Sequence, residues 1–497
     1  MTIEVCDLFA GAGGSATGAA GVPGVEVTMA ANHWPTAVDV HQAAFPDARH
    51  DCADLSGVDF RRYPAADILL ASPECTSHTA SKGVSRRRQS VGLFDDPDPG
   101  AERSRATMWD VHRYVEVHRP AAVVVENVVE AHAWLYWPSW WQAFADAGYD
   151  AQVVSLNSMH AGVPQSRDRI YVVAMRRGVK ADLSLRPEAW CPGCEQVVAA
   201  RQAWKNGRRV GRYRRQYLYR CPTCAGVVEP ATSPASSIID WGLPSLRIGD
   251  RRRPLAEATL RRIRLGLERY GVAVVAGAGN TWERPGSGYA RAWPVSDPLP
   301  TQTTTNGHGL ALPGLIAELR GGGSRDKLRP VSDPLATVEA GANHHALVCP
   351  PLVVQPAHGG DDATRVRGVE RPLPTVCASD DRPLTVEPPA ITVGDHHDLL
   401  VAYNSTGRAQ PVSRPAPTLT TKDRLALVVP QLDIEDCTFR MFEPHEVGAA
   451  MAFAPGYAGE TMAALTKRDR VRLYGNAVTP PAMTFIVGRV VDALVAA

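Results

Sequence analysis

The fold is indicated by residues 4–14, EVCDLFAGAGG, where an apolar run passes directly into a glycine-rich turn. The run predicts a strand over Glu4–Phe9, and a helix-like segment follows the glycines. Glycines there permit a tight turn and close approach to a ligand, while the helix N-terminus offers N–H groups to an anion. The motif alone leaves two interpretations open: a site for a nucleotide-like cofactor, or plain packing of a strand against a turn.

Four further apolar runs of strand length follow the first one. They are Val25–Ala30, Asp67–Ala71, Ala121–Val125 and Ile170–Ala174. Amphipathic segments of helix length separate them, and this alternation predicts a parallel sheet that helices cover on both faces. The expected fold class is therefore α/β, with a doubly wound, mostly parallel sheet.

The end of the second predicted strand limits the choice of cofactor. This strand leads into Asn32-His33-Trp34, without the acid that holds the ribose in NAD-binding proteins. The ring of Trp34 could stack on an adenine. The sequence therefore argues against NAD and leaves a different nucleotide-like cofactor open.

The composition of the 497-residue chain is that of a globular protein, with 44% hydrophobic and 21% charged residues. No apolar run approaches the roughly 20 residues that a membrane span needs, and no signal peptide precedes the first strand. We therefore expect a cytoplasmic protein with no membrane partner. The net charge of +1 identifies no partner, because the distribution of charge matters more than its sum.

Four of the ten cysteines form two Cys-Pro-x-Cys pairs with the spacing of a zinc ribbon. The pairs are Cys191 with Cys194 and Cys221 with Cys224, and we expect their thiolates to hold a structural Zn²⁺. Cys75 lies in a proline-containing turn, and the remaining five are scattered. This pattern indicates a metal site and a nucleophile in a reducing compartment, not a disulfide framework.

The stretch between the two cysteine pairs is strongly basic and carries interleaved aromatic residues. The basic residues are Arg201, Lys205, Arg208, Arg209, Arg212, Arg214, Arg215 and Arg220. The aromatic residues are Trp204, Tyr213, Tyr217 and Tyr219. A merely solvated face would normally mix both signs of charge, so a basic ribbon suits contacts with phosphates.

A repeated motif marks the Pro-, Thr-, Gly- and His-rich region that follows. It begins Pro-Val-Ser-Asp-Pro-Leu at 294–301 and 330–337, and recurs more loosely at 371–375 and 414–418. Most copies are followed by a polar tip and an apolar run, so each unit resembles a strand, a polar loop and a second strand. The His, Asn, Asp and Arg side chains of the tips are candidates for contacts with bases. A Pro-rich linker is the alternative, although a linker would not keep inserting apolar strands.

The α/β character returns after residue 437, which implies that the middle of the chain is an insertion. We therefore expect a catalytic domain over 1–186 that 431–497 completes. The expected insertions are a zinc ribbon over 187–230, a helical connector over 231–290 that contains a basic helix, and a repeat-containing, β-rich region over 291–430.

Reactive or charged residues stand at the ends of the predicted strands. Cys75, in Ser72-Pro73-Glu74-Cys75, follows the third strand, where open α/β sheets place their ligands. Glu126 ends the fourth strand, and Arg167 and Arg169 precede the fifth. Taken singly, the thiol is equally compatible with a buried structural cysteine, and the charged groups with structural ion pairs.

As an ordered set, these motifs resemble the cytosine-C5 DNA methyltransferase family. The family's hallmarks stand here as Phe9–Gly13, Pro73–Cys75, Glu126–Val128, Gln165–Arg169 and Gly475–Val478. The resemblance covers roughly 1–175 and 437–497. It implies the S-adenosylmethionine-dependent, Rossmann-like fold and the activity of a DNA (cytosine-5-)-methyltransferase (EC 2.1.1.37). The inserted repeats occupy the place of the family's variable target-recognition domain.

The resemblance also implies a role for each matching residue. Cys75 would attack C6 of a flipped-out cytosine while Glu126 hydrogen-bonds N3, and Arg167 and Arg169 would hold the cysteine loop and the base. S-adenosyl-L-methionine would supply the methyl group. The residues expected to line its pocket are Phe9, Ala10, Gly11, Gly13, Trp34, Asp54 and Asn476.

The chain departs from the family pattern at two positions. Glu74 precedes the cysteine where the family usually has proline, and a carboxylate there would disfavour the thiolate unless it points away. His33 stands where the family usually has an acid that binds the ribose. Neither departure removes an atom that the chemistry requires.

The expected partner is double-stranded DNA inside a bacterial or phage-infected cell, in a host-defence or phage-associated modification role. A cognate restriction nuclease is a candidate second partner. Two alternatives stay open: a catalytically silent relative that binds DNA, and the same fold acting on RNA or making another C5 modification. Intact Cys75, Glu126, Arg167 and Arg169 argue against the silent relative.

Overall fold

The computed structural model describes residues 2–73, 99–240 and 437–497 without a gap, and part of the chain between 243 and 435. Residues 74–98, which include Cys75, lie outside the described residues. The chain forms two compact units. The first comprises Met1–Asp240, Ser296–Asn306 and Glu443–Ala497, and the second comprises Trp241–Val295 and Gly307–Phe442.

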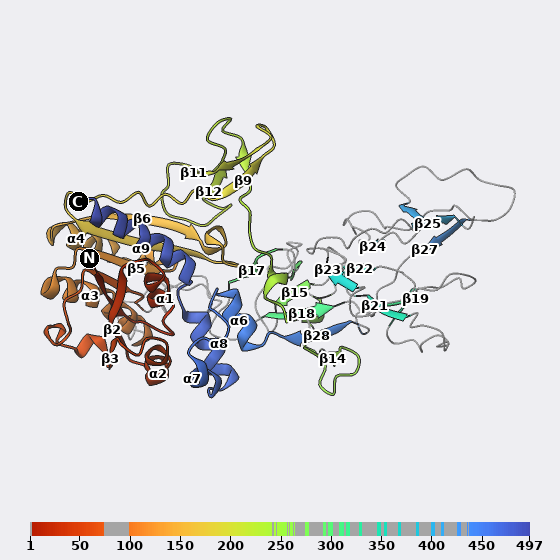
Figure 1. The fold of residues 1–497 in the computed structure, drawn as a ribbon, viewed down its shortest axis with the longest axis horizontal. Coiled ribbons are helices and arrows are strands. Elements are labelled where there is room, and N and C mark those ends of the chain that lie inside the picture. The colour runs from red at the N-terminus through yellow and green to blue at the C-terminus, as the bar shows by residue number, and fades with distance from the viewer. Residues whose placement is uncertain are drawn as a thin grey trace, which may run out of the picture. The chain divides into compact units, whose positions relative to one another are not determined.

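The first unit is built on a seven-stranded sheet with the order β3-β2-β1-β4-β5-β8-β6 (Figure 1). Parallel pairs join β3, β2, β1, β4 and β5, whereas β8 is antiparallel to both of its neighbours. The strands are β1 (Ile3–Leu8), β2 (Val25–Asn32), β3 (Arg49–Cys52), β4 (Ile68–Ala71), β5 (Ala122–Asn127), β6 (Tyr149–Asn157) and β8 (Asp168–Arg176). The predicted α/β class with a mostly parallel sheet is confirmed.

Two strands of this sheet, β3 and β6, have no counterpart in the sequence prediction. They are the two edge strands, and their residues are a mixture of buried, half-buried and exposed. An edge strand packs on fewer neighbours, so it lacks the continuous apolar run that marks a strand buried inside a parallel sheet. That run was the feature by which the other five strands were predicted.

Helices cover both faces of the sheet because successive side chains of a strand point to opposite sides. On one face, Leu69 and Val123 belong to a core with helices α3 and α4. On the other face, Leu70 and Val124 belong to a core with α1 and α9. The α-helices of this unit are α1 (Gly14–Ala20), α2 (Pro35–Ala44), α3 (Pro99–His118), α4 (Trp137–Asp146), α6 (Pro444–Ala450), α7 (Gly459–Ala463), α8 (Lys467–Asn476) and α9 (Pro480–Val495).

Helix α9 comes from the far end of the chain to lie beside α1 (Figure 1). The two helices approach closely: a Cβ atom on Gly18 would lie 2.5 Å from the carbonyl oxygen of Pro480. By length and composition alone, the stretch Lys467–Val495 could cross a membrane. In this fold, however, Met483 and Ile486 of α9 are fully buried in the core of the first unit.

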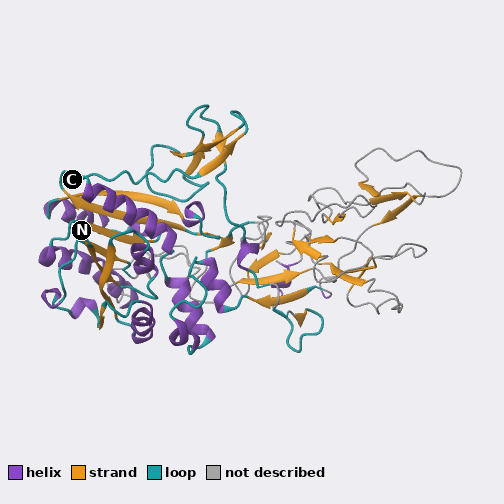
Figure 2. Ribbon diagram, viewed as in Figure 1, coloured by secondary structure: helices purple, strands orange, loops and turns teal. Residues whose placement is uncertain are grey.

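A small all-β insertion follows β8 and belongs to the first unit. Figure 2 shows it as strands and loops. Its strands are β9 (Glu188–Cys191) and β10 (Gln196–Ala199), which form a hairpin, and β11 (Arg201–Trp204), β12 (Tyr217–Arg220) and β13 (Val227–Val228), which form an antiparallel sheet. Residues 188–228 are called the ribbon below.

The second unit contains four similar groups of antiparallel strands, and β14 (Leu246–Arg247) and β28 (Thr438–Met441) extend the first group through β18. In each group the first strand in sequence lies in the middle and pairs with the two others. The groups are β15 (Val274–Gly277) with β16 (Ala292–Pro294) and β18 (His308–Leu312); β19 (Leu315–Glu318) with β20 (Leu328–Pro330) and β21 (His345–Val348); β22 (Leu352–Val354) with β23 (Val366–Gly368) and β24 (Leu384–Val386); and β25 (Leu399–Ala402) with β26 (Ala409–Pro411) and β27 (Leu425–Val428).

The strand register also recurs in the four groups. The first residue of each middle strand pairs with the last residue of the next strand: Val274 with Pro294, Leu315 with Pro330, Leu352 with Gly368, and Leu399 with Pro411. Each copy of the repeated sequence motif begins at, or within three residues of, the end of that second strand. The unit of repetition therefore contains three strands, where the sequence indicates two.

Candidate active site and cysteine cluster

Strands β4 and β5 bring two predicted site segments to the same edge of the sheet. Ala71 pairs with Val125, so the residues that follow both strands lie side by side. Asn127 connects the segments, because its Nδ2 donates a hydrogen bond to the Pro73 carbonyl at 3.4 Å. Its Oδ1 accepts from the Val128 N–H at 2.8 Å. The segment that leads to Cys75 is thus attached to the end of β5 two residues before the cysteine.

Glu126 and Arg169 form a close ion pair at this edge. The Arg169 Nε lies 2.9 Å from the Glu126 Oε1, and the two side chains are only 14% and 11% exposed. Coulomb attraction is stronger for such a shielded pair than for one in open water. The pair fixes the orientation of a carboxyl group at the carboxyl end of a parallel strand, where open α/β sheets bind their ligands.

Arg167 lies two residues from Arg169 but contacts a different part of the chain. Its guanidinium group donates to the carbonyl oxygens of Gly475, at 3.3 Å, and Ala477, at 3.2 Å. Its backbone N–H donates to Asn157 Oδ1 at 3.0 Å. The structure therefore joins Arg167 to the Gly-Asn-Ala-Val segment near the C-terminus, and Arg169 to Glu126.

The glycine-rich turn adopts the left-handed conformations that its sequence predicts. The φ angles are 55° at Gly11 and 89° at Gly13. A Cβ atom on Gly13 would lie 2.5 Å from the hydroxyl of Tyr457, which donates to the Ala12 carbonyl at 2.7 Å. A Cβ atom on Gly14 would lie 2.0 Å from the Val478 carbonyl oxygen. The C-terminal segment therefore packs on the turn itself, which only glycine permits.

The other predicted pocket residues extend from neighbouring elements. Trp34 directly precedes α2, and the guanidinium carbon of Arg472 lies 4.2 Å from the centre of its indole ring. Asp54 accepts the Ser56 N–H at 3.2 Å and so caps a short 3₁₀ helix, η1 (Leu55–Gly57). Asn476 is exposed at the end of α8. Phe9 and Ala10 are buried beside the glycines.

Asp7 is a buried acid beside this turn that the sequence reasoning missed. It lies in β1 and is fully buried, and among the described residues only the backbone of Ala16 comes near enough to act on its carboxylate as a hydrogen-bond donor. Burial raises its pKa to about 8, although the backbone of Ala16 acts in the opposite direction. A charged residue inside an otherwise apolar strand was the signal that could have identified it.

Asn127, Tyr457 and Arg472 also make contacts at this edge that were not predicted. Asn127 stands inside the Glu-Asn-Val motif, but only its neighbour Glu126 was predicted to be a site residue. Tyr457 and Arg472 belong to a C-terminal stretch in which the sequence shows no motif. Their contacts with Ala12 and Trp34 join positions more than four hundred residues apart, and such pairs become apparent only once the chain has folded.

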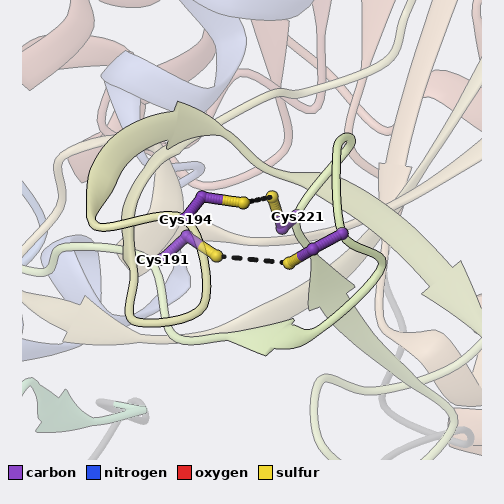
Figure 3. Close-up of side chains that lie close together, drawn as sticks. Cys191, Cys194 and Cys221 are labelled. Carbon is purple, nitrogen blue, oxygen red and sulfur yellow. Dashed lines mark hydrogen bonds between the residues drawn. The ribbon is translucent and has the colours of Figure 1, made fainter.

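The four cysteines of the ribbon converge on one point. Cys191 Sγ lies 3.5 Å from Cys224 Sγ, and Cys194 Sγ lies 3.8 Å from Cys221 Sγ (Figure 3). All four sulfur atoms lie within 4.8 Å of one another. A tetrahedral zinc ion with Zn–S bonds of about 2.3 Å would separate its sulfurs by about 3.8 Å. Backbone N–H groups, chiefly that of Cys224, lower the pKa of Cys221 to about 6, which favours the thiolate a metal binds.

The ribbon's basic residues divide into two sets. Arg212 pairs with Glu130 and Arg214 with Glu229, while Lys205 and Arg220 donate to backbone carbonyls. The second set consists of exposed arginines whose side chains form no hydrogen bond or ion pair with the described residues: Arg201, Arg208, Arg209 and Arg215. The tyrosines 213, 217 and 219 do not face solvent, because they form the ribbon's own apolar core.

The sequence comparisons with known proteins concern one part of the chain. Residues 3–192 match the family model described as C-5 cytosine-specific DNA methylase. The type II methyltransferase M.HgiBI of Herpetosiphon aurantiacus is 32% identical over 184 residues, which cover 36% of this chain and 38% of that protein. M.HgiDI of the same organism is 28% identical over 186 residues, which cover 37% and 55%.

The match to these curated relatives spans 38% and 55% of their length. Among solved structures, the Entamoeba histolytica methyltransferase EhMeth aligns over 99% of this chain and 98% of its own, with 13% identity and a TM-score of 0.46. Residues 3–192 of this chain are thus similar to the C-5 cytosine-specific DNA methylases.

Proposed function

We propose that this protein transfers a methyl group from S-adenosyl-L-methionine to C5 of a cytosine in double-stranded DNA, through a covalent bond between Cys75 Sγ and C6. The observation that carries the proposal is the edge formed by β4 and β5. There, the Glu126–Arg169 pair stands beside Pro73, whose carbonyl accepts a hydrogen bond from Asn127. The match of residues 3–192 to the C-5 cytosine-specific DNA methylase family model supports this assignment.

Each proposed step uses a residue of this chain. The Cys75 thiolate adds to C6 while the Glu126 carboxyl group, having taken up a proton from solvent, donates a hydrogen bond to N3, so that electron density shifts toward C5. Bound S-adenosylmethionine supplies an electrophilic methyl group. After methylation, the C5 proton passes to solvent, the C5–C6 double bond re-forms, and Cys75 Sγ leaves. Because C6 is inaccessible inside a stacked duplex, the cytosine must first be flipped out.

The residues around the glycine turn fit an adenosyl cofactor. The positive φ angles of Gly11 and Gly13 allow the backbone to approach a ligand where a Cβ atom would intrude. Phe9, Ala10 and Gly13 from the first strand and turn, Trp34 and Asp54 from the next two strand ends, and Asn476 from α8 would hold the group. Trp34 would stack on the adenine.

DNA binding is proposed for the ribbon and the second unit. Zinc held by the four cysteines would order the ribbon, and its unpaired arginines, Arg201, Arg208, Arg209 and Arg215, would contact phosphates. The polar segments between the strands of the repeats would contact base edges and select the target sequence. Such an enzyme would act in the cytoplasm, within a restriction-modification system whose cognate nuclease would be its partner.

The direct test of the proposal is covalent trapping. Purified protein, S-adenosylmethionine and duplex DNA containing 5-fluorocytosine should give a denaturation-resistant adduct, because fluorine at C5 blocks the loss that releases Cys75. Cys75→Ser should abolish the adduct. The matched control, Cys52→Ser, alters an exposed cysteine of β3 and should leave the adduct intact. An adduct that persists in Cys75→Ser would refute the mechanism, and trapping on RNA but not on DNA would refute the substrate.

A further inference from the structure

One turn of the ribbon makes three polar contacts with the rest of the first unit. This turn, residues 210–213, lies in the loop between β11 and β12. The Gly211 N–H donates to Ser155 Oγ at 3.2 Å, and the Tyr213 N–H donates to Asp168 Oδ1 at 3.0 Å. Between them, the Arg212 guanidinium pairs with Glu130. Three consecutive residues of the ribbon thus bind polar groups of the catalytic core.

The partners of this turn flank the proposed catalytic pair. Asp168 lies between Arg167 and Arg169. Ser155 pairs in the sheet with Ile170, the residue after Arg169. Glu130 lies in the 3₁₀ helix η5 (Val129–Ala133), which begins two residues after the end of the Glu126–Asn127 segment. Any displacement of the turn would therefore act on both chain segments that carry the Glu126–Arg169 pair.

Asp168 depends on the ribbon for a hydrogen-bond donor. Burial raises the pKa of this carboxyl group, while hydrogen bonds from the Tyr213 backbone and the Asn157 side chain lower it. A buried carboxylate that loses one of its few donors is destabilised, by about 1–3 kcal/mol for a typical buried polar group. Without the Tyr213 N–H, the strand segment between the two arginines would therefore be less firmly held.

Packing provides a second connection between ribbon and core. The imidazole of His160 lies edge-on to the rings of Tyr213 and Tyr219, at 4.4 Å and 4.8 Å between ring centres. Burial lowers the pKa of His160 to about 4, so the ring packs as a neutral group. His160 belongs to the 3₁₀ helix η6 (Ser158–Ala161), where the Ser158 N–H donates to the Arg167 carbonyl at 2.9 Å.

The cysteine cluster holds the strand that carries this turn. Strand β12 ends at Arg220, directly before Cys221, and Tyr217 and Tyr219 of the same strand form the ribbon's core with Cys191 and Cys221. A domain of this size has too little apolar area to fold firmly without a staple such as a metal ion. The position of the turn therefore depends on the state of the four thiolates.

From these contacts we infer that the metal-loaded ribbon is a brace for the active site, with Arg212 and Asp168 as positioning residues for the Glu126–Arg169 pair. The inference rests on the proposed methyl transfer for its rate measurements, but not for its structural readout. It assigns the ribbon a role in turnover that is separate from phosphate binding.

The variant Arg212→Ala distinguishes a positioning role of the ribbon from a role in phosphate binding. We expect its single-turnover methylation rate at saturating DNA to fall at least tenfold, with less than a twofold change in DNA dissociation constant. The matched control, Glu188→Ala, alters an exposed charged residue of β9, outside the turn, and should leave both the saturated rate and the DNA dissociation constant within twofold of the unaltered protein. The charge-reversed double variant Arg212→Glu, Glu130→Arg should recover part of the rate. A normal saturated rate in Arg212→Ala, or no recovery in the double variant, would overturn the inference.

Hydrogen exchange tests the brace without any methyl transfer. Chelation should remove about one equivalent of Zn²⁺ and raise amide exchange several-fold in residues 166–171, which carry Asp168 and both arginines. Amide exchange in β1 and β2, which β4 and β5 separate from β8 in the sheet, should not change. Exchange in 166–171 that stays unchanged while the ribbon itself loses protection would overturn the brace. Because this result needs no DNA, it remains interpretable if the proposed substrate is wrong.

Discussion

Arg167 and Arg169 are separated by one residue, yet they stabilise different parts of the first unit. Arg169 lies in β8, whereas Arg167 precedes that strand, and the two guanidinium groups take different partners. Arg169 reaches Glu126, and Arg167 reaches the carbonyls of Gly475 and Ala477. The Gln-x-Arg-x-Arg pattern identified both arginines in the sequence. Which partner each would take followed from the pairing of β5 with β8 and from the return of the C-terminal segment.

Asp7 makes the stability of the protein depend on pH. Its pKa is raised to about 8 in the folded state, against about 4 in an unfolded chain. Between these values the folded protein keeps a proton that the unfolded chain has released, so the free energy of unfolding falls as the pH rises toward 8. Asp7→Asn imitates the protonated acid and should remove this part of the pH dependence.

Urea unfolding at pH 5.5 and pH 8.5 would measure the effect of Asp7. From pH 5.5 to pH 8.5, the free energy of unfolding of Asp7→Asn should rise relative to that of the unaltered protein. Asp39→Asn, which alters an exposed carboxylate of α2, serves as the control and should follow the unaltered protein at both. If Asp7→Asn and the unaltered protein lose stability equally between the two pH values, Asp7 is not the titrating group.

At the scale of elements, the contact between α1 and α9 holds the N-terminal and C-terminal parts of the first unit together. The two helices come from opposite ends of the chain, and their apolar faces cover one side of the sheet together. Gly18 lets them approach, because a Cβ atom there would lie 2.6 Å from Met483 Cβ. The membrane-like hydropathy of Lys467–Val495 is accounted for by this burial.

Gly18→Ala should therefore destabilise the first unit. Overpacking of a close helix contact costs about 1–3 kcal/mol, and this exceeds the gain of up to about 1 kcal/mol that alanine brings to a helix. Gly488→Ala is the matched control in α9, where the new Cβ atom would meet only Val22 Cγ2, at 4.0 Å. It should leave stability unchanged or raise it. Urea midpoints for the two variants give the comparison, and equal midpoints would show that the helices are not in close contact.

At the scale of the whole molecule, the first unit is interrupted in the sequence by a second unit of repeated strand groups. Because each group starts at an equivalent register position, the groups can be treated as modules. Removal of residues 352–398 would delete the β22 group and join its predecessor to β25 at the equivalent position. If the repeats select the target, such a deletion changes specificity and leaves chemistry intact.

Methylation mapping on plasmid DNA would test this modular arrangement. The deletion of 352–398 should keep its affinity for S-adenosylmethionine, since no proposed cofactor residue lies there, and should methylate a different set of sequences. Deletion of 315–351, the β19 group, should change the set in another way. An unchanged target sequence in both deletions would assign recognition to another part of the chain.

The sequence was sufficient for the properties that depend on local pattern. The apolar runs between helix-length segments determined the α/β class, because a strand buried on both faces must be continuously apolar. The order of five short motifs identified the family that residues 3–192 match. The spacing of the two cysteine pairs indicated a four-thiolate cluster, because each pair needs only one tight turn to bring its sulfurs together.

Tertiary structure decided the features that depend on pairing between distant residues. The edge strands β3 and β6 became apparent only in the assembled sheet, because edge strands carry no distinctive sequence pattern of their own. The antiparallel direction of β8 was likewise visible only in the assembled sheet. The contacts of Arg212 with Glu130 and of Tyr457 with Ala12 join residues 82 and 445 positions apart. No local pattern encodes such pairs, because the energy that selects them is the burial and hydrogen bonding of the assembled unit. The sequence predicted the turn within residues 4–14, but it did not predict that the C-terminal segment packs against this turn.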